Sequence, residues 1–451
     1  MNDITAFFAF LKYCLGYKGD MSRVVAGMDW QELYSFASKQ AILGLCFDGI
    51  ERLGKEYSEE LRLNPIGREL LMPWMGKAQQ IRRQNMKVNT EASKLFYMLR
   101  EDGMRCCVLK GQGNALMYPN PYSRTPGDID VWIDASRERI MEYAQKKFEL
   151  EDDIRLQHLE TSLDGVPVEL HFFPCSMNNP IYHARLQKWF KLNADLQCSN
   201  VVSLPDGIGE IAIPTTAFNV IYQLTHLYHH FFDEGIGMRQ IIDYFLVVND
   251  FSKNVFLNND LSNHPVPLSK EGSTFSPSPS SSGSGDVTAP SRCSEPLRSK
   301  DGGPSKVSPD CAGWDRLAIE EDNSAGSTTA VTSSASTALV VVQRELKYLG
   351  LWKFAGAVMY VLHEALGLPE EKMIAPMDEK RGKLLLAEIL NGGNFGKHFT
   401  KYGHFTQQGM AKKYFLKIWR NMHFVRYYPA EALSEPIFRT WHFFWRLKHR
   451  G

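Results

Sequence analysis

The sequence lacks any stretch that approaches the roughly 20 consecutive apolar residues needed to span a bilayer. It also lacks the pattern of a secretory signal peptide, because the acidic Asp3 precedes the first apolar run and Lys12 ends that run. Both absences favour a cytoplasmic protein.

The sequence also lacks cysteines at metal-binding or redox-motif spacing, and it has no excess of positive or negative charge. The eight cysteines form no C-x-x-C pair, and no histidine cluster completes a zinc pattern, so we expect reduced thiols in a reducing compartment. Lys and Arg together number 51, as do Asp and Glu, so the formal net charge is zero. This balance gives no overall electrostatic reason to expect a nucleic-acid partner, although a local basic patch stays open.

What the sequence does contain falls into four segments. Helical spacing of apolar residues predicts a helical segment over 1–103 and a helical domain formed by 214–251 and 338–451. Short strands and helices alternate over 104–213, which predicts a small α/β core on a mixed sheet. Residues 252–337 are dominated by Ser, Pro, Gly, Thr, Asp and Asn, and this composition predicts a disordered insertion. The expected fold class is therefore α+β, with a small mixed-sheet core embedded in mainly helical segments.

The strand expected over 128–134 carries the first candidate chemistry. Because a strand alternates its faces with period two, Asp128 and Asp130 share one face. Two carboxylates that close repel each other unless a cation lies between them, and their hard oxygen atoms suit Mg²⁺ or Mn²⁺. The alternative interpretation is a solvated strand edge. The alternation predicts a buried face of Ile129, Val131 and Ile133, and an opposite face of Asp128, Asp130, Trp132 and Asp134.

A hairpin further along the chain offers a third acid. Two strands, expected over 154–163 and 166–173, are joined by an Asp-Gly dipeptide, which is a strong hairpin signal. In the second strand Glu169 and His171 share one face, and an acid in so apolar a strand is unusual. If this strand lies beside the aspartate strand, Glu169 joins the metal site. The alternative is an exposed strand residue.

A turn over 110–113, Lys-Gly-Gln-Gly, leaves a strand expected over 106–109 and enters a helix. Glycines at such a junction let backbone N–H groups approach a phosphate. Lys110 and Arg124 would add positive charge for a triphosphate. An ordinary strand-to-helix turn is the alternative interpretation. Taken together, the turn and the three acids predict phosphoryl transfer with two metal ions.

The three motifs together resemble a known group of enzymes. Leu-Lys-Gly at 109–111, Arg-x-x-Gly-Asp-Ile-Asp at 124–130 and Val-Glu-Leu-His at 168–171 resemble a bacterial family of uncharacterised nucleotidyltransferases. More broadly, they resemble the DNA polymerase beta-like nucleotidyltransferase superfamily. The specific motifs cover about residues 105–175.

The resemblance implies roles for the motif residues. Asp128 and Asp130 would hold Mg²⁺ or Mn²⁺, and Glu169 would be a third ligand or the base that prepares an acceptor hydroxyl. Gly111 would lie against the phosphates of an NTP. Two positions differ from the wider superfamily, which more often has Gly or Ser after that glycine and Asp as the third acid. The predicted nucleotide-binding residues are Lys110, Gly111, Gln112, Arg124 and Gly127.

The expected reaction is the transfer of an NMP group from an NTP to a hydroxyl or phosphate acceptor. The resemblance leaves the acceptor open, because members of the superfamily modify nucleic acids, proteins, antibiotics and sugars. The alternative is a binding or adaptor protein with a weak or inactive core, either antitoxin-like or associated with envelope polysaccharide.

Weaker signals lie in the segment after the core. Arg239 and Asp243, four residues apart, are expected to pair along a helix. The alternative places them in a substrate cleft, which His171 would also line. His226 and His230 share one helical face, and we expect a polar helix face there rather than a metal cluster.

Two further segments lie near the C-terminus. Residues 391–396 predict a helix-ending turn, with a contact to substrate as the alternative. Residues 436–450 are aromatic and basic, which predicts a helix docked on the core. The alternative for this helix is a peripheral contact with the anionic inner face of a membrane.

Overall fold

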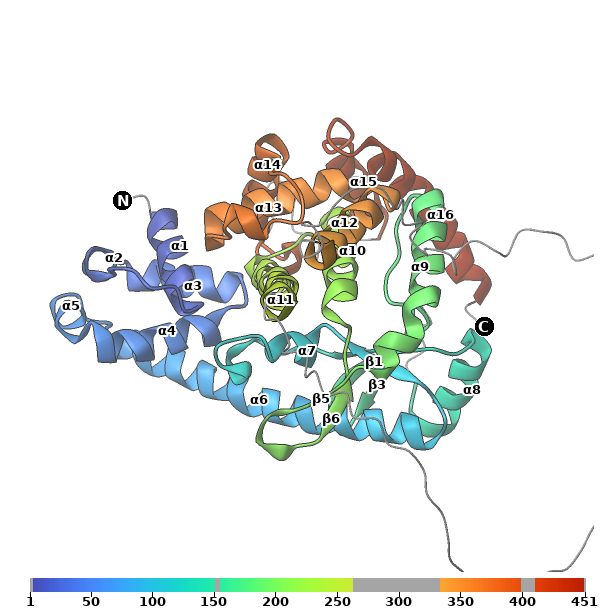
Figure 1. The fold of residues 1–451 in the computed structure, drawn as a ribbon, viewed down its shortest axis with the longest axis horizontal. Coiled ribbons are helices and arrows are strands. Elements are labelled where there is room, and N and C mark those ends of the chain that lie inside the picture. The colour runs from blue at the N-terminus through green and yellow to red at the C-terminus, as the bar shows by residue number, and fades with distance from the viewer. Residues whose placement is uncertain (1–2, 151–154, 263–332, 399–409, 450–451) are drawn as a thin grey trace, which may run out of the picture. The chain divides into compact units, whose positions relative to one another are not determined.

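The computed structural model of the chain describes residues 3–150, 155–262, 333–398 and 410–449, and every structural statement below concerns those residues. Helices dominate this part of the chain, and a small sheet lies among them (Figure 1). The arrangement confirms the predicted α+β class. Within the described ranges, no helix is both long and apolar enough to cross a membrane.

Six helices precede the sheet. The third begins where Asp29 caps it, because the Asp29 side chain accepts a hydrogen bond from the backbone N–H of Glu32. The sixth spans 34 residues and runs along the sheet. The six helices are α1 (Asp3–Cys14), α2 (Ser22–Ala26), α3 (Trp30–Lys39), α4 (Leu43–Glu56), α5 (Ser58–Leu63) and α6 (Arg68–Glu101).

The main sheet has four strands in the order β1-β2-β4-β3. Strands β2 and β4 run parallel, whereas β1 with β2 and β3 with β4 run antiparallel. The sheet is therefore mixed, as predicted, and Asp164 and Gly165 turn the β3–β4 hairpin with positive φ angles of 48° and 76°. The strands are β1 (Cys106–Leu109), β2 (Ile129–Ile133), β3 (His158–Leu163) and β4 (Val166–His171).

Short elements connect these strands and follow them. Between β1 and β2 lie a short helix and a single 3₁₀ turn, and a longer helix separates β2 from β3. A second, two-stranded sheet follows helix α9. These elements are α7 (Gly111–Ala115), η1 (Pro121–Ser123), α8 (Arg137–Lys147), α9 (Pro180–Ser199), β5 (Val201–Ser203), η2 (Pro205–Gly207) and β6 (Glu210–Ala212).

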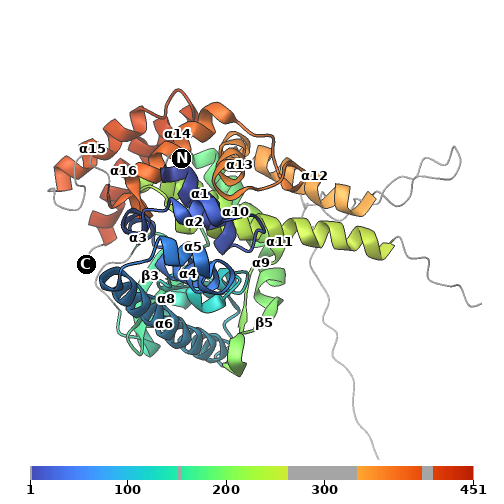
Figure 2. The same cartoon turned by 90° about the vertical axis from the view of Figure 1, so that its left-hand side faces the viewer.

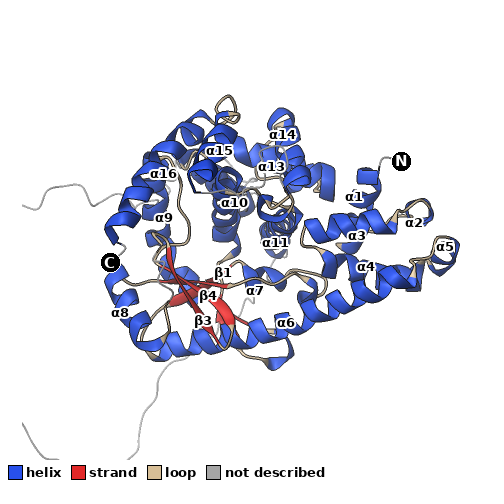
Figure 3. Cartoon of the chain, turned by 180° about the vertical axis from the view of Figure 1, so that it is seen from behind, coloured by secondary structure: helices blue, strands red, loops and turns tan. Residues whose placement is uncertain are grey.

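Helices cover both faces of the main sheet (Figure 3). On one face, Ile129 and Val131 pack into a core to which α6 contributes. On the other face, the ring of Trp132 stacks on Phe218 of α10 (Thr216–Asp233), with centroids 6.1 Å apart, and contacts Phe190 of α9. The sequence predicted a buried face only for the isoleucine and valine side. That part of the prediction was wrong, because the helices that follow the sheet also bury Trp132.

The C-terminal helices pack around aromatic side chains and return to the N-terminal ones. The ring of Phe231 lies 4.5 Å from that of Phe424, measured between centroids. Helix α1 lies beside α13 (Figure 2). After α1, the Tyr17 hydroxyl donates a hydrogen bond to the Gly367 carbonyl at 3.3 Å. These helices are α11 (Met238–Ser262), α12 (Ser333–Tyr348), α13 (Trp352–Leu366), η3 (Glu370–Lys372), α14 (Glu379–Gly392), η4 (Asn394–Gly396), α15 (Met410–Met422) and α16 (Pro429–His449).

Two of the predictions for the C-terminal half concern irregular segments. Helix α14 ends at Gly392, and Gly393 follows with a φ of 62°, so the helix-ending turn is confirmed. The prediction of a disordered insertion falls mainly on residues 263–332, which lie outside the described part of the chain. The two ends of the predicted insertion are helical, because α11 continues to Ser262 and α12 begins at Ser333.

Helix α16 is docked on the core by a buried carboxylate. The Glu431 side chain is 1% exposed, and its two oxygens accept hydrogen bonds from the backbone N–H groups of Asn178 at 2.6 Å and Asn179 at 3.3 Å. Burial raises the pKa of Glu431 to about 7, and the two N–H donors only partly offset it. The docked helix agrees with the first interpretation of the C-terminus, while the membrane contact stays a prediction.

Glu431 gives the protein a pH-dependent stability. Since its folded pKa lies above its unfolded value, the folded state binds more protons, and stability falls as the pH rises through this window. Glutamine cannot ionise, so the free energy of unfolding of Glu431→Gln lacks this pH dependence. We expect the difference in free energy of unfolding, Glu431→Gln minus wild type, to increase by about 2 kcal/mol from about pH 5 to about pH 8. Urea denaturation at both pH values measures this. A constant difference between the two proteins, like that expected for the exposed control Glu379→Gln, contradicts the assignment.

Candidate active site

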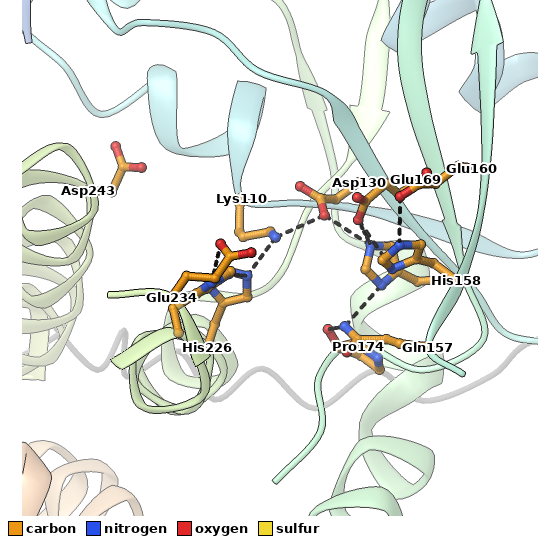
Figure 4. Close-up of polar contacts among 12 residues, drawn as sticks. Lys110, Asp130, Gln157, His158, Glu160, Glu169, Pro174, His226, Glu234 and Asp243 are labelled. Carbon is orange, nitrogen blue, oxygen red and sulfur yellow. Dashed lines mark hydrogen bonds and ion pairs between the residues drawn. The ribbon is translucent and has the colours of Figure 1, made fainter. Parts of the chain in front are cut away.

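The structure brings the predicted acids of β2 and β4 together. Asp130 and Glu169 are register partners in the parallel pairing of these strands, so their side chains are neighbours on one face of the sheet. Asp128 precedes β2 by one residue and keeps an exposed side chain. All three line a cavity of about 420 Å³, a size typical of ligand sites. Figure 4 shows Asp130 and Glu169 pointing to the same place.

Two cations already contact the acids. The Lys110 Nζ atom lies 2.9 Å from Asp130 Oδ1, and the His171 Nε2 atom lies 3.0 Å from the same oxygen and 3.1 Å from Glu169 Oε2. Burial opposes the charge on Asp130, but Lys110 and His171 hold the pKa of this carboxyl well below its usual range. Burial also opposes the charge on His171, yet the two carboxylates raise its pKa to about 9. His171 is therefore a charged bridge between two acids.

The positive charges of Lys110 and His171 do not keep all three acids ionised, and Asp128 is the acid that stays more easily protonated. The negative charge of Asp130, then the loss of solvent around a carboxyl that faces into the cavity, and then the charge of Glu169 raise the pKa of Asp128 to about 6, even though the residue keeps an exposed surface. Such repulsion between close carboxylates is relieved by a bound cation. The three carboxylates offer the oxygen ligands that Mg²⁺ and Mn²⁺ prefer. The chemistry of the donor set therefore suits a divalent metal ion, although among the described residues the group whose ligand atoms all lie within 4.8 Å of one another is His158, Glu169 and His171.

The glycine turn forms one edge of the cavity. Lys110 has a φ of 54° and Gly111 a φ of 28°, so the chain turns sharply between β1 and α7. Gly111 and Gly127 both line the cavity. Gln112 does not, because its buried side chain donates a hydrogen bond to Asn89 of α6. Of the five predicted nucleotide-binding residues, four thus lie at the cavity and one is turned away from it.

Arg124 lies at the cavity in a buried ion pair. Its guanidinium contacts the Asp243 carboxylate through Nε at 2.9 Å and Nη2 at 2.7 Å, and each side chain is 6% exposed. The Tyr118 hydroxyl donates to the same carboxylate at 2.7 Å. Despite burial, Asp243 raises the pKa of Arg124. The predicted pairing of Arg239 with Asp243 is wrong, since Arg124, from a distant part of the sequence, is the ion-pair partner of Asp243.

Arg239 lines the cavity without a carboxylate partner in the described structure. Its Nη1 atom donates to the Thr125 carbonyl at 3.2 Å, and its guanidinium carbon lies 5.4 Å from the centroid of the Phe395 ring. Its Nε atom is buried and has no hydrogen-bond partner in the described part of the chain. Burial, and then the neighbouring Arg124, lower the pKa of Arg239 from its usual value.

Helix α10 supplies the wall opposite the sheet. The His226 Nε2 atom lies 2.8 Å from Lys110 Nζ and 3.1 Å from His230 Nε2 (Figure 4). The two histidines share a helical face, as predicted, but this face lines the cavity together with Glu234 and, from the turn after α14, Phe395. Burial lowers the pKa of both histidines, and the charge of Lys110 adds to the effect. They are therefore neutral beside the charged lysine.

Several cavity residues were not singled out by the sequence analysis. His158 is the most prominent, because it lies directly opposite His171 in the β3–β4 pairing. Burial lowers its pKa to about 4. The register of the β3–β4 hairpin places His158 opposite His171. The sequence could have given this pairing if residues had been counted outward from the predicted Asp-Gly turn. Gln157 also lines the cavity, and no local motif marks it. Phe395 lines the cavity too, and it belongs to the 391–396 segment for which contact with substrate was the alternative interpretation.

Comparison with known proteins gives one match. The sequence profile of a family described as uncharacterised nucleotidyltransferase matches residues 26–262, more than half of the chain. The matched region contains the whole four-stranded sheet together with helices α10 and α11. No curated protein and no solved structure matches the chain.

Proposed function

We propose that this chain, which belongs to the family of uncharacterised nucleotidyltransferases, transfers an NMP group from an NTP to a hydroxyl or phosphate acceptor with the help of a divalent metal ion. The observation that carries the proposal is that three acids line one cavity beside a glycine turn, two of them, Asp130 and Glu169, as register partners on neighbouring strands. Membership of the family supports nucleotidyl transfer in general and implies an NTP as the donor substrate. The metal, the residue roles and the acceptor class are our own inference.

Asp128, Asp130 and Glu169 would hold Mg²⁺ or Mn²⁺. The ion would supply positive charge that activates the acceptor hydroxyl and neutralises the leaving pyrophosphate. Glu169 would accept the proton of that hydroxyl, because its carboxylate lies in the cavity and its hydrogen bond from His171 keeps it ionised. The backbone at Gly111 and Gly127 would admit the phosphates, since neither residue has a side chain to fill the space.

Arg239 would bind the triphosphate. Its guanidinium is charged, lies next to Gly127 and keeps one buried N–H without a partner in the described structure. We expect Arg239→Gln to weaken NTP binding by about 10- to 100-fold, because a charge-assisted hydrogen bond contributes about 1.5–3 kcal/mol. Isothermal titration with an NTP and Mn²⁺ measures the effect. Arg185→Gln serves as a control, since Arg185 contacts the Tyr348 carbonyl away from the cavity. Equal NTP affinity in the Arg239 variant and the control argues against this role.

A screen for label transfer tests the proposed reaction. Each α-labelled NTP is incubated with the full-length protein, Mg²⁺ or Mn²⁺, and a set of nucleic-acid, protein, sugar and aminoglycoside acceptors. We expect release of pyrophosphate and label on one acceptor class. Label on no class, with the nucleotide bound but no pyrophosphate released, supports the second candidate instead.

The second candidate is a binding or adaptor protein with an inactive core. One observation favours it: Lys110 and His171 already neutralise Asp130 and Glu169 within the described structure. A protein that keeps these contacts in the presence of Mn²⁺ would hold no metal ion. Metal-dependent binding of an NTP therefore separates the two candidates.

A further inference from the structure

Two histidines lie beside Glu169 on the same face of the sheet. His158 of β3 and His171 of β4 are register partners, and their ring centroids are 5.0 Å apart. The His158 Nδ1 atom lies 3.3 Å from Glu169 Oε2, and the His171 Nε2 atom lies 3.1 Å from the same oxygen. One ligand atom from each of the three residues lies within 4.8 Å of the other two. Figure 4 shows the ring of His158 beside Glu169.

His158 is a buried polar side chain whose hydrogen bonds are not satisfied. It is only 8% exposed, and its ring nitrogens lie 3.3 Å from a Glu169 oxygen and 3.5 Å from a Glu160 oxygen without forming a hydrogen bond within the described residues. Buried polar groups in folded proteins are nearly always hydrogen-bonded, so an imidazole left in this state needs an explanation. A metal ligand is one, because an imidazole nitrogen that faces a carboxylate across a small gap can coordinate a cation placed between them.

The outer neighbour of His158 fits the same explanation. The His158 Nε2 atom, on the far side from Glu169, lies 3.5 Å from the acceptor oxygen Oε1 of Glu160. A metal-bound histidine usually directs the nitrogen that does not bind the metal at such an acceptor, because the contact orients the ring.

We propose that His158, Glu169 and His171 form a binding site for a divalent transition-metal ion, adjacent to the Asp128–Asp130 pair. Two imidazoles and one carboxylate suit Mn²⁺, Fe²⁺, Co²⁺ or Zn²⁺, whereas Mg²⁺ prefers oxygen ligands alone. The inference rests on the proposed function only in that Glu169 would belong to both sites. It adds His158 as a ligand. It also favours a transition-metal ion over Mg²⁺, a choice that the three acids alone do not make.

Pulsed electron paramagnetic resonance of bound Mn²⁺ tests the site, because it detects directly coordinated ¹⁴N nuclei without any substrate. In the full-length protein we expect couplings from two imidazole nitrogens. In His158→Gln we expect one nitrogen and Mn²⁺ affinity lower by about 10- to 100-fold. His363→Gln is the matched control, since His363 contacts the Leu368 carbonyl and does not line the cavity, and it should keep both couplings. His158→Phe replaces His158→Gln if the latter does not fold.

The outcomes distinguish this inference from the proposed function. Wild-type protein without nitrogen coupling, or a His158 variant with both couplings unchanged, overturns the histidine site. If such a protein still transfers an NMP group with Mg²⁺, the proposed function survives without it. Two nitrogen couplings in a protein that transfers no label support the site and count against the reaction. A 100-fold excess of Mg²⁺ should leave the couplings in place, and their loss would contradict the choice of metal class.

Discussion

Asp130→Asn should reduce nucleotidyl transfer by about 1000-fold, equivalent to about 4 kcal/mol of transition-state stabilisation. Asp130 is the acid at the centre of the cluster: it is the register partner of Glu169 and the contact of both Lys110 and His171. Asparagine keeps its size but removes the negative charge that a divalent ion needs. The rate of pyrophosphate release in the presence of the acceptor measures the effect.

Asp134→Asn is the matched control for this variant. Asp134 directly follows the same strand, and its replacement by asparagine is the same chemical change. Its carboxylate pairs with Arg105, and it does not line the cavity. We expect it to keep at least half of the wild-type rate. Circular dichroism and thermal unfolding of both variants report whether the fold is retained. An Asp130 variant that folds and turns over as fast as the Asp134 control refutes the role of this acid.

Arg124→Met should cost about 3–5 kcal/mol of folding free energy, the second largest effect that we expect. The substitution leaves Asp243 as a buried charge without its guanidinium partner, with only the Tyr118 hydroxyl still donating to it. Breaking one side of a buried ion pair is costly because the remaining charge stays desolvated. Since Arg124 precedes β2 and Asp243 lies on α11, the loss would also loosen the acid strand from the helical wall.

A double-mutant cycle separates the pair from the rest of the packing. Arg124→Met combined with Asp243→Leu removes both charges, and we expect the double variant to be more stable than Arg124→Met alone by about 1–3 kcal/mol. Urea denaturation of the four proteins gives the coupling energy. A cost below about 1 kcal/mol for Arg124→Met, within the range of an exposed pair, contradicts a structural role for this contact.

The strands and their acids were predictable from local pattern. The strand within Asp128 to Asp134 and the Asp-Gly turn after β3 are encoded by neighbouring residues, and the structure has both, although β2 is buried on both of its faces. The sequence did not predict that β2 pairs with β4, because nothing in it specifies which strands become neighbours. The role of Glu169 therefore depended on that pairing. That pairing aligns Asp130 with Glu169 and is the step that the structure adds.

The contacts that the sequence did not predict join residues far apart in the chain. Arg124 and Asp243 are separated by 119 residues, whereas the expected partner Arg239 is one helical turn away. Local spacing favoured the wrong pair because it cannot represent a tertiary contact. Gln112 was chosen for its place in the glycine turn, yet its side chain points to Asn89. In each case burial against a distant helix decided the outcome.

Titration of a non-hydrolysable NTP into the protein, with and without Mn²⁺, tests the central claim most directly because it requires no acceptor. We predict that Mn²⁺ tightens nucleotide binding to the wild type by at least about 10-fold, about 1.4 kcal/mol of coupling, and that Asp128→Asn/Asp130→Asn abolishes this gain. Nucleotide binding that is the same with and without Mn²⁺, or an equal gain in the double variant, would contradict a metal–nucleotide site at these carboxylates.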